Sequence, residues 1–107
     1  MNRWPTLTAL AMPALLSAAV ARAEAPAKPA RLGLCAACHG ENGIATTSGI
    51  PNLAAQNHEY LVAALRQYRS GERAAQAMRA VAGSLSDADI DALAAWYATQ
   101  TGRGVAR

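Results

Sequence analysis

The sequence of 107 residues predicts an all-α domain with three main helices and one long loop. In two segments, residues 58–70 and 87–101, apolar side chains recur three and four positions apart, as on one face of a helix. Residues 41–57, which follow a first helical segment, contain glycine, proline, serine and threonine in the pattern of a loop. No run alternates between apolar and polar side chains as a half-buried strand does.

Residues 1–23 are predicted to be a secretory signal peptide. Arg3 supplies a short positive region, residues 6–20 an apolar region, and Ala21-Arg22-Ala23 an A-x-A cleavage site. An uncleaved membrane anchor is the alternative. The apolar run is shorter than the roughly 18 residues that a spanning helix needs, and Pro13 interrupts it. We therefore expect export, with cleavage at this site.

Cleavage leaves residues 24–107, a length that suits one small domain. The formal net charge of the whole sequence is +3. Loss of Arg3 and Arg22 lowers the number of lysine and arginine residues from 10 to eight, against seven aspartate and glutamate residues. This nearly balanced charge provides no electrostatic footprint for nucleic acid, so we expect no nucleic-acid partner.

The first two helices are delimited by recognisable signals. Residues 24–29 form a short proline- and alanine-rich leader, and the first helix is expected over residues 30–40. The second helix is expected to start after Asn57, a residue type that caps the free N–H groups of a first turn. Gly71 is its natural stop. Its expected apolar face consists of Leu61, Ala64, Leu65 and Tyr68.

The C-terminal third predicts a short turn of helix and then the last main helix. The short turn is expected around residues 74–77. The last helix is expected to begin at Ser86, with Asp89 three residues later as in a capping box, and to end at Gly102. Its expected apolar face consists of Ile90, Leu93, Ala94 and Tyr97.

The most informative motif lies in the first helix, where Cys35 and Cys38 are followed directly by His39. This C-x-x-C-H spacing is the signature of c-type haem attachment. Two thiols one helical turn apart can each form a thioether with a vinyl group of one porphyrin, and the adjacent imidazole can ligate the iron. The motif therefore predicts one covalently attached haem c held by Cys35, Cys38 and His39, with His39 as an iron ligand.

Three other uses of the cysteines were weighed against haem attachment. A disulfide between Cys35 and Cys38 is the simplest. A closed zinc site usually has four ligands in paired clusters, and His58 is the only further histidine. A thioredoxin-like redox pair needs a βαβ setting, and no strand-like run precedes these cysteines. A thiol-redox or zinc module of this kind predicts a colourless protein.

The second axial position on the iron decides between electron transfer and ligand chemistry. Met1 and Met12 belong to the predicted signal peptide, so Met78 is the only thioether in residues 24–107. We expect Met78 to ligate the iron, which raises the reduction potential and denies oxygen and peroxide a coordination position. A core-filling role for this methionine is the alternative. His58 and Lys28 are weaker rival ligands.

At this point the sequence resembles class I c-type cytochromes, and most closely the bacterial cytochrome c553/c4 group. Four ordered elements, which cover essentially all of residues 24–107, carry the resemblance. They are Cys35-Ala36-Ala37-Cys38-His39-Gly40 with Gly43; Pro51-Asn52-Leu53 with Gln56; Tyr68-Arg69-Ser70-Gly71-Glu72-Arg73; and Met78 with residues 85–90 and 94–97. Ala55 stands where the group usually has glycine, so we expect a slightly different backbone there.

The resemblance implies the cytochrome c fold, in which the helices and the long loop wrap around one covalently attached haem. It implies that the Pro51 carbonyl accepts a hydrogen bond from Nδ1–H of His39, which fixes the tautomer of the iron ligand. It also implies that Leu53 packs on the ring. Arg69 or Arg73 can pair with a haem propionate, although an ordinary solvated arginine is an equal expectation.

The sequence therefore predicts a periplasmic electron carrier rather than an enzyme. It would take one electron from a quinol-oxidising complex or a dehydrogenase and pass it to a terminal oxidase or reductase. We expect transient docking with redox partner proteins, no small-molecule substrate, and contact with the membrane only through partner complexes. Two alternatives stay open: a dedicated haem subunit of a periplasmic dehydrogenase, and a gas- or peroxide-binding haem protein.

Overall fold

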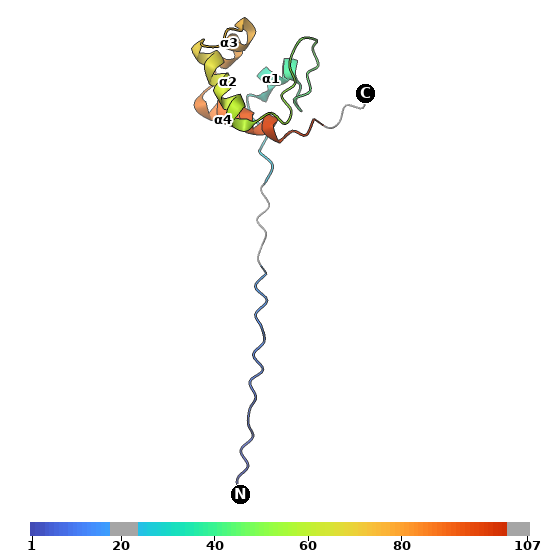
Figure 1. The fold of residues 1–107 in the computed structure, drawn as a ribbon, viewed down its shortest axis with the longest axis vertical. Coiled ribbons are helices and arrows are strands. Elements are labelled where there is room, and N and C mark those ends of the chain that lie inside the picture. The colour runs from blue at the N-terminus through green and yellow to red at the C-terminus, as the bar shows by residue number, and fades with distance from the viewer. Residues whose placement is uncertain (18–23, 103–107) are drawn as a thin grey trace.

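The computed structural model describes residues 1–17 and 24–102, and within them it confirms the all-α class, with four helices and no strand. The helices are α1 (Leu32–His39), α2 (His58–Ser70), α3 (Gln76–Ala82) and α4 (Asp87–Thr99). Figure 1 shows them gathered in one body, in which α2 contacts both α3 and α4. Residues 1–17 are exposed and have no regular secondary structure. The predicted cleavage site at residues 21–23 lies outside the described residues.

No helix in the described part of the chain is long and apolar enough to cross a membrane.

Helix α2 begins and ends where its capping residues predict. The side chain of Asn57 accepts a hydrogen bond from the backbone N–H of Tyr60 at 2.9 Å. Gly71 ends the helix with a φ of 84°, in the left-handed region that glycine adopts at little cost. Of the predicted apolar face, Leu61 and Ala64 are buried, and Leu65 and Tyr68 pack partly buried beside the core.

Helix α4 has the predicted start but ends earlier than predicted. The Ser86 hydroxyl accepts from the Asp89 backbone N–H, and the Asp89 carboxylate accepts from the Ser86 backbone N–H, each at 3.0 Å. The helix stops at Thr99 rather than at Gly102. The backbone becomes extended at Gln100, with φ −71° and ψ 135°, and this ends the helix. The Tyr97 carbonyl accepts there from the backbone N–H groups of Gln100 at 3.2 Å and of Ala55 at 3.1 Å.

The prediction of a single short turn at residues 74–77 was wrong. The structure has a seven-residue helix, α3, which starts two residues later and contains Met78. Its N-cap, Ala75, makes no side-chain hydrogen bond, so the usual start signal is missing. Packing supplies the stability instead, because Ala82 is fully buried and α3 lies against α2.

The hydrophobic core lies between α4 and the helices around it. The predicted apolar face of α4, Ile90, Leu93, Ala94 and Tyr97, is at most 2% exposed. This face packs with Leu32 and Cys35 of α1 and Leu61 of α2. The core therefore anchors the end of α1 that carries the C-x-x-C-H motif.

The loop between α1 and α2 is held by backbone hydrogen bonds. The Gly43 carbonyl accepts from the N–H groups of Leu53 and Ala54, at 2.8 and 3.1 Å. Gly40 has a φ of 79°, and a Cβ at this position would overlap the carbonyl oxygen of Ile44. Ala55 has a φ of 58°, so it adopts the left-handed conformation that glycine favours.

Candidate functional site

A single cavity brings together every site residue that the sequence predicts. It has a volume of about 470 Å³ and lies between α1, α2, α3 and the loop that precedes α2. The predicted residues that line it are Cys35, Cys38, His39, Pro51, Leu53 and Met78. Most of the other lining residues are apolar, and α2, α3 and α4 contribute the larger part of them. The volume falls within the range of roughly 300–1,000 Å³ that is typical of ligand and cofactor sites.

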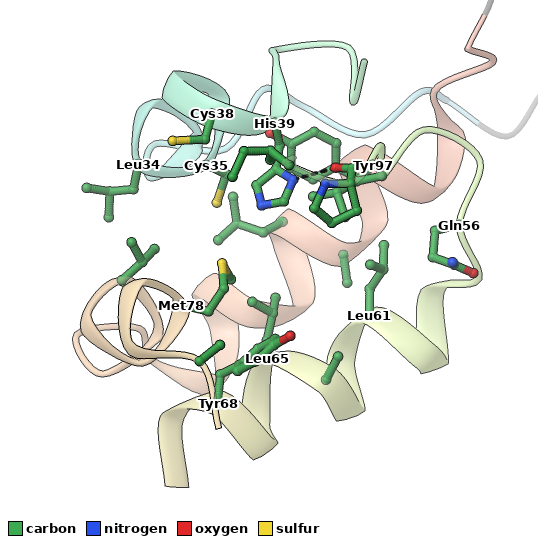
Figure 2. Close-up of a pocket in the computed structure, with 18 of the residues that line it drawn as sticks. Leu34, Cys35, Cys38, His39, Gln56, Leu61, Leu65, Tyr68, Met78 and Tyr97 are labelled. Carbon is green, nitrogen blue, oxygen red and sulfur yellow. Dashed lines mark hydrogen bonds between the residues drawn. The ribbon is translucent and has the colours of Figure 1, made fainter. Parts of the chain in front are cut away.

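His39 is held at the top of this cavity in Figure 2 by a single hydrogen bond. Its residue is 7% exposed, and its Nδ1 atom lies 2.8 Å from the carbonyl oxygen of Pro51. A carbonyl can only accept, so Nδ1 carries the proton in this bond and Nε2 keeps its lone pair. The His39 ring therefore offers a basic nitrogen suited to a metal.

Cys35 and Cys38 both line the cavity as free thiols. Cys35 is buried and Cys38 is exposed. Burial raises the pKa of the Cys35 thiol to about 11. A redox-active cysteine needs the opposite shift, towards the thiolate, so this environment does not favour a thiol-redox role for Cys35. Within the described ranges, no three His, Cys, Asp or Glu side chains gather as a metal site.

Met78 approaches the cavity from α3, on the side opposite His39 (Figure 2). It is half-buried, and it lines a space whose walls are largely apolar. The rival ligands do not line the cavity. His58 lies 3.1 Å from Asp91 on the surface, and Lys28 forms an ion pair with Glu41 at 2.7 Å.

The structure distinguishes between Arg69 and Arg73, the two arginines that the sequence left as alternative partners of a haem propionate. Arg69 does not line the cavity. It donates instead to the Leu85 carbonyl at 3.1 Å and to the Asp87 carboxylate at 2.7 Å. Its guanidinium lowers the pKa of Asp87 through that hydrogen bond. Arg73 instead lines the cavity, where it is the only lysine or arginine among the lining residues.

Two tyrosines of α2 fix the position of Arg73. Its Nη1 donates to the Tyr60 hydroxyl at 3.3 Å, and its guanidinium carbon lies 4.8 Å from the centre of the Tyr68 ring. The hydrogen bond to Tyr60 is the main cause of a raised pKa at Arg73. Tyr60 was not predicted from the sequence as a cavity residue, although its spacing of four from Ala64 and eight from Tyr68 places all three on one stripe of α2.

The donor set of this cavity fits a c-type haem. Two thiols, a lone-pair nitrogen and a thioether meet in one largely apolar space. Imidazole and thioether are axial ligands of haem iron, and the thiols are the groups that form thioethers with its vinyl groups. The apolar walls suit a large flat ring that must be kept from water.

Comparison with known proteins agrees with this chemistry. The family described as cytochrome c oxidase, cbb3-type, subunit III matches residues 21–96. Cytochrome c-554(548) of Halomonas halodenitrificans is 39% identical over 72% of this chain and 96% of the relative. Cytochrome c4 of Pseudomonas aeruginosa is 34% identical over 80% of this chain and 43% of the relative.

A third relative carries a function in its name. The thiosulfate dehydrogenase electron acceptor of Stutzerimonas stutzeri is 36% identical over 82% of this chain. The match covers 47% of that protein. The chain therefore spans nearly all of one relative and less than half of the other two.

Proposed function

The chain belongs to the c-type cytochromes, and on that premise we propose that it is an exported one-electron carrier with a His39/Met78-ligated haem. Haem c, the cofactor of this family, supplies reversible exchange of one electron between ferrous and ferric iron. The observation that carries the proposal is the placement of His39 and Met78 on opposite sides of one apolar cavity that both cysteines also line.

Each residue of the site has a distinct part in this proposal. The thiols of Cys35 and Cys38 would attach the cofactor covalently, and Nε2 of His39 and Sδ of Met78 would ligate its iron. Pro51 keeps the proton on Nδ1 and so keeps Nε2 available. Leu53, Leu61 and Leu65 line the cavity and exclude water. With both axial positions filled, the site favours electron transfer over binding of oxygen or peroxide.

We propose transient docking with redox partner proteins, with the periplasm as the compartment. Small interfaces that form and separate quickly are typical of electron-transfer encounters. The relatives named as electron acceptors of thiosulfate dehydrogenase support a second candidate, a carrier dedicated to one dehydrogenase. A stable complex with such an enzyme would distinguish it from a carrier with several partners.

Voltammetry of the periplasmically expressed holoprotein tests the proposal. A carrier gives a reversible one-electron wave, unchanged by hydrogen peroxide, and elutes as a monomer in gel filtration. A catalytic current with peroxide, or an irreversible wave, would contradict the carrier function and favour a peroxide-binding haem protein.

A further inference from the structure

Helix α4 touches both chain segments that form the His39 side of the cavity. The Tyr97 hydroxyl donates to the carbonyl oxygen of Gly40 at 2.9 Å, in a buried hydrogen bond, and Gly40 directly follows His39. The Tyr97 carbonyl accepts from the backbone N–H of Ala55 at 3.1 Å, four residues beyond Pro51. One residue therefore holds the chain just after His39 and just after Pro51.

The segment that follows His39 and the segment that follows Pro51 are also hydrogen-bonded to each other, which restricts their relative movement. The Gly43 carbonyl accepts from Leu53 and Ala54, and the Tyr97 ring packs so closely on Gly43 that a Cβ there would lie 3.0 Å from its Cδ1 atom. Figure 2 shows Tyr97 beside His39 at this end of the cavity. A displacement of Gly40 is therefore passed to the imidazole on one side and to the loop on the other.

The Tyr97 hydroxyl is a dependable donor in this position. The residue is 2% exposed, and burial raises the pKa of its phenol, so the proton stays on the oxygen. Without this donor, the Gly40 carbonyl keeps only the Gly43 N–H, at 3.3 Å. The hydrogen bond between Gly43 and Gly40 closes a turn within the α1–α2 loop and does not connect the loop to α4.

We propose that Tyr97 is a positioning residue for His39, which sets the His39–Pro51 hydrogen bond through the Gly40 carbonyl and thereby tunes the haem iron. The inference rests on the proposed function. A well-aligned bond from Nδ1–H to a carbonyl raises the basicity of the ligating nitrogen. A more basic ligand stabilises ferric iron and lowers the reduction potential.

The test is Tyr97→Phe in the holoprotein, with Trp96→Phe as the matched control. Trp96 also donates from α4 to the α1–α2 loop, from Nε1 to the Glu41 carbonyl at 2.7 Å, but one residue farther from His39. In Tyr97→Phe we expect a higher reduction potential. We also expect His39 Nδ1–H to exchange with solvent roughly tenfold faster, a factor that matches the loss of one hydrogen bond. Trp96→Phe should keep the wild-type potential and exchange rate.

A merely structural role for Tyr97 predicts a different result. Both variants would then lose thermal stability, while the potential and the His39 exchange rate would equal the wild-type values, and this outcome would overturn the inference. If Tyr97→Phe yields no holoprotein, 3-fluorotyrosine at position 97 is the second variant. Its hydroxyl is a stronger hydrogen-bond donor and should lower the reduction potential. An unchanged reduction potential in this variant would also overturn the inference. The proposed function fails separately, by loss of the reversible one-electron wave in the wild-type protein.

Discussion

The Nδ1 atom of His39 lies 2.8 Å from the carbonyl oxygen of Pro51, which is 12 positions away in the chain. This bond joins the end of α1 to the loop that precedes α2 and directs the imidazole into the cavity. The protein alone therefore fixes both the tautomer and the direction of the residue that we propose as iron ligand.

Arg73→Gln should lower the reduction potential of the holoprotein. Among the residues that the structure describes, Arg73 is the only lysine or arginine that lines the cavity, and a nearby cation disfavours the extra positive charge of ferric iron. Arg66→Gln is the control, because Arg66 is an equally exposed arginine that does not line the cavity. Equal potentials for the two variants in a redox titration would argue against a role for Arg73 at the cofactor.

Ala55→Gly should stabilise the protein by about 0.5–1 kcal/mol. Alanine in the left-handed region costs roughly 1–2 kcal/mol, and the extra freedom of glycine in the unfolded chain offsets part of that gain. Ala54→Gly is the matched control, because Ala54 does not have a positive φ and its replacement should destabilise. Denaturant unfolding measures both; a loss of stability in Ala55→Gly would mean that the loop is not strained at this residue.

Gly40→Ala should destabilise the fold by about 3–5 kcal/mol and reduce the yield of holoprotein. The backbone there has φ 79° and ψ 152°, a region that is essentially restricted to glycine, and a Cβ would overlap Ile44.

Gly49→Ala is the control for this substitution. Gly49 has a similar φ of 80°, but a Cβ there meets nothing within 4 Å, so only backbone strain of roughly 1–2 kcal/mol is expected. Equal losses of stability for the two variants would show that the contact with Ile44 does not matter.

Acid should weaken the protein partly through Asp89. The Ser86 backbone N–H is the main cause that holds the Asp89 pKa below its ordinary value of 3.8. A depressed carboxyl pKa gives stability that is present above the ordinary value and is lost as pH falls through the lowered one. Asp89→Asn should therefore be less stable than wild type at pH 7, with the two stabilities converging in strong acid. Parallel stability curves over this range would contradict the role of the Asp89 charge.

The sequence predicted α2 and α4 well because their starts are encoded locally. Asn57 and Ser86 cap the first turns with their own side chains, and the apolar faces follow the helical period. Helix α3 lacks the capping signal, because Ala75 cannot cap it, and packing against α2 stabilises it. At the end of α4, the Tyr97 carbonyl accepts from Gln100 and also from Ala55, a residue that is far away in the sequence.

In the candidate site, too, features that depend on neighbouring residues were predicted, and features that depend on residues far away in the chain were not. The C-x-x-C-H motif and the single thioether identified the cavity residues, because their chemistry is readable from residue type and spacing. The sequence could not show which of Arg69 and Arg73 lies at the cavity. That depends on Leu85 and Asp87, which engage Arg69 from 16 and 18 positions away. The Tyr97–Gly40 bond, across 57 positions, was equally inaccessible.

The most direct test of the central claim is the absorption spectrum of periplasmically expressed protein, oxidised and then reduced, with and without carbon monoxide. A His39/Met78 site predicts a low-spin haem c with a sulfur-to-iron band in the oxidised form. That band should vanish in Met78→Ala and persist in the surface control His58→Ala, and only Met78→Ala should bind carbon monoxide. Ready binding of carbon monoxide by the native reduced protein would contradict the claim, because it would mean that Met78 leaves the second axial position open.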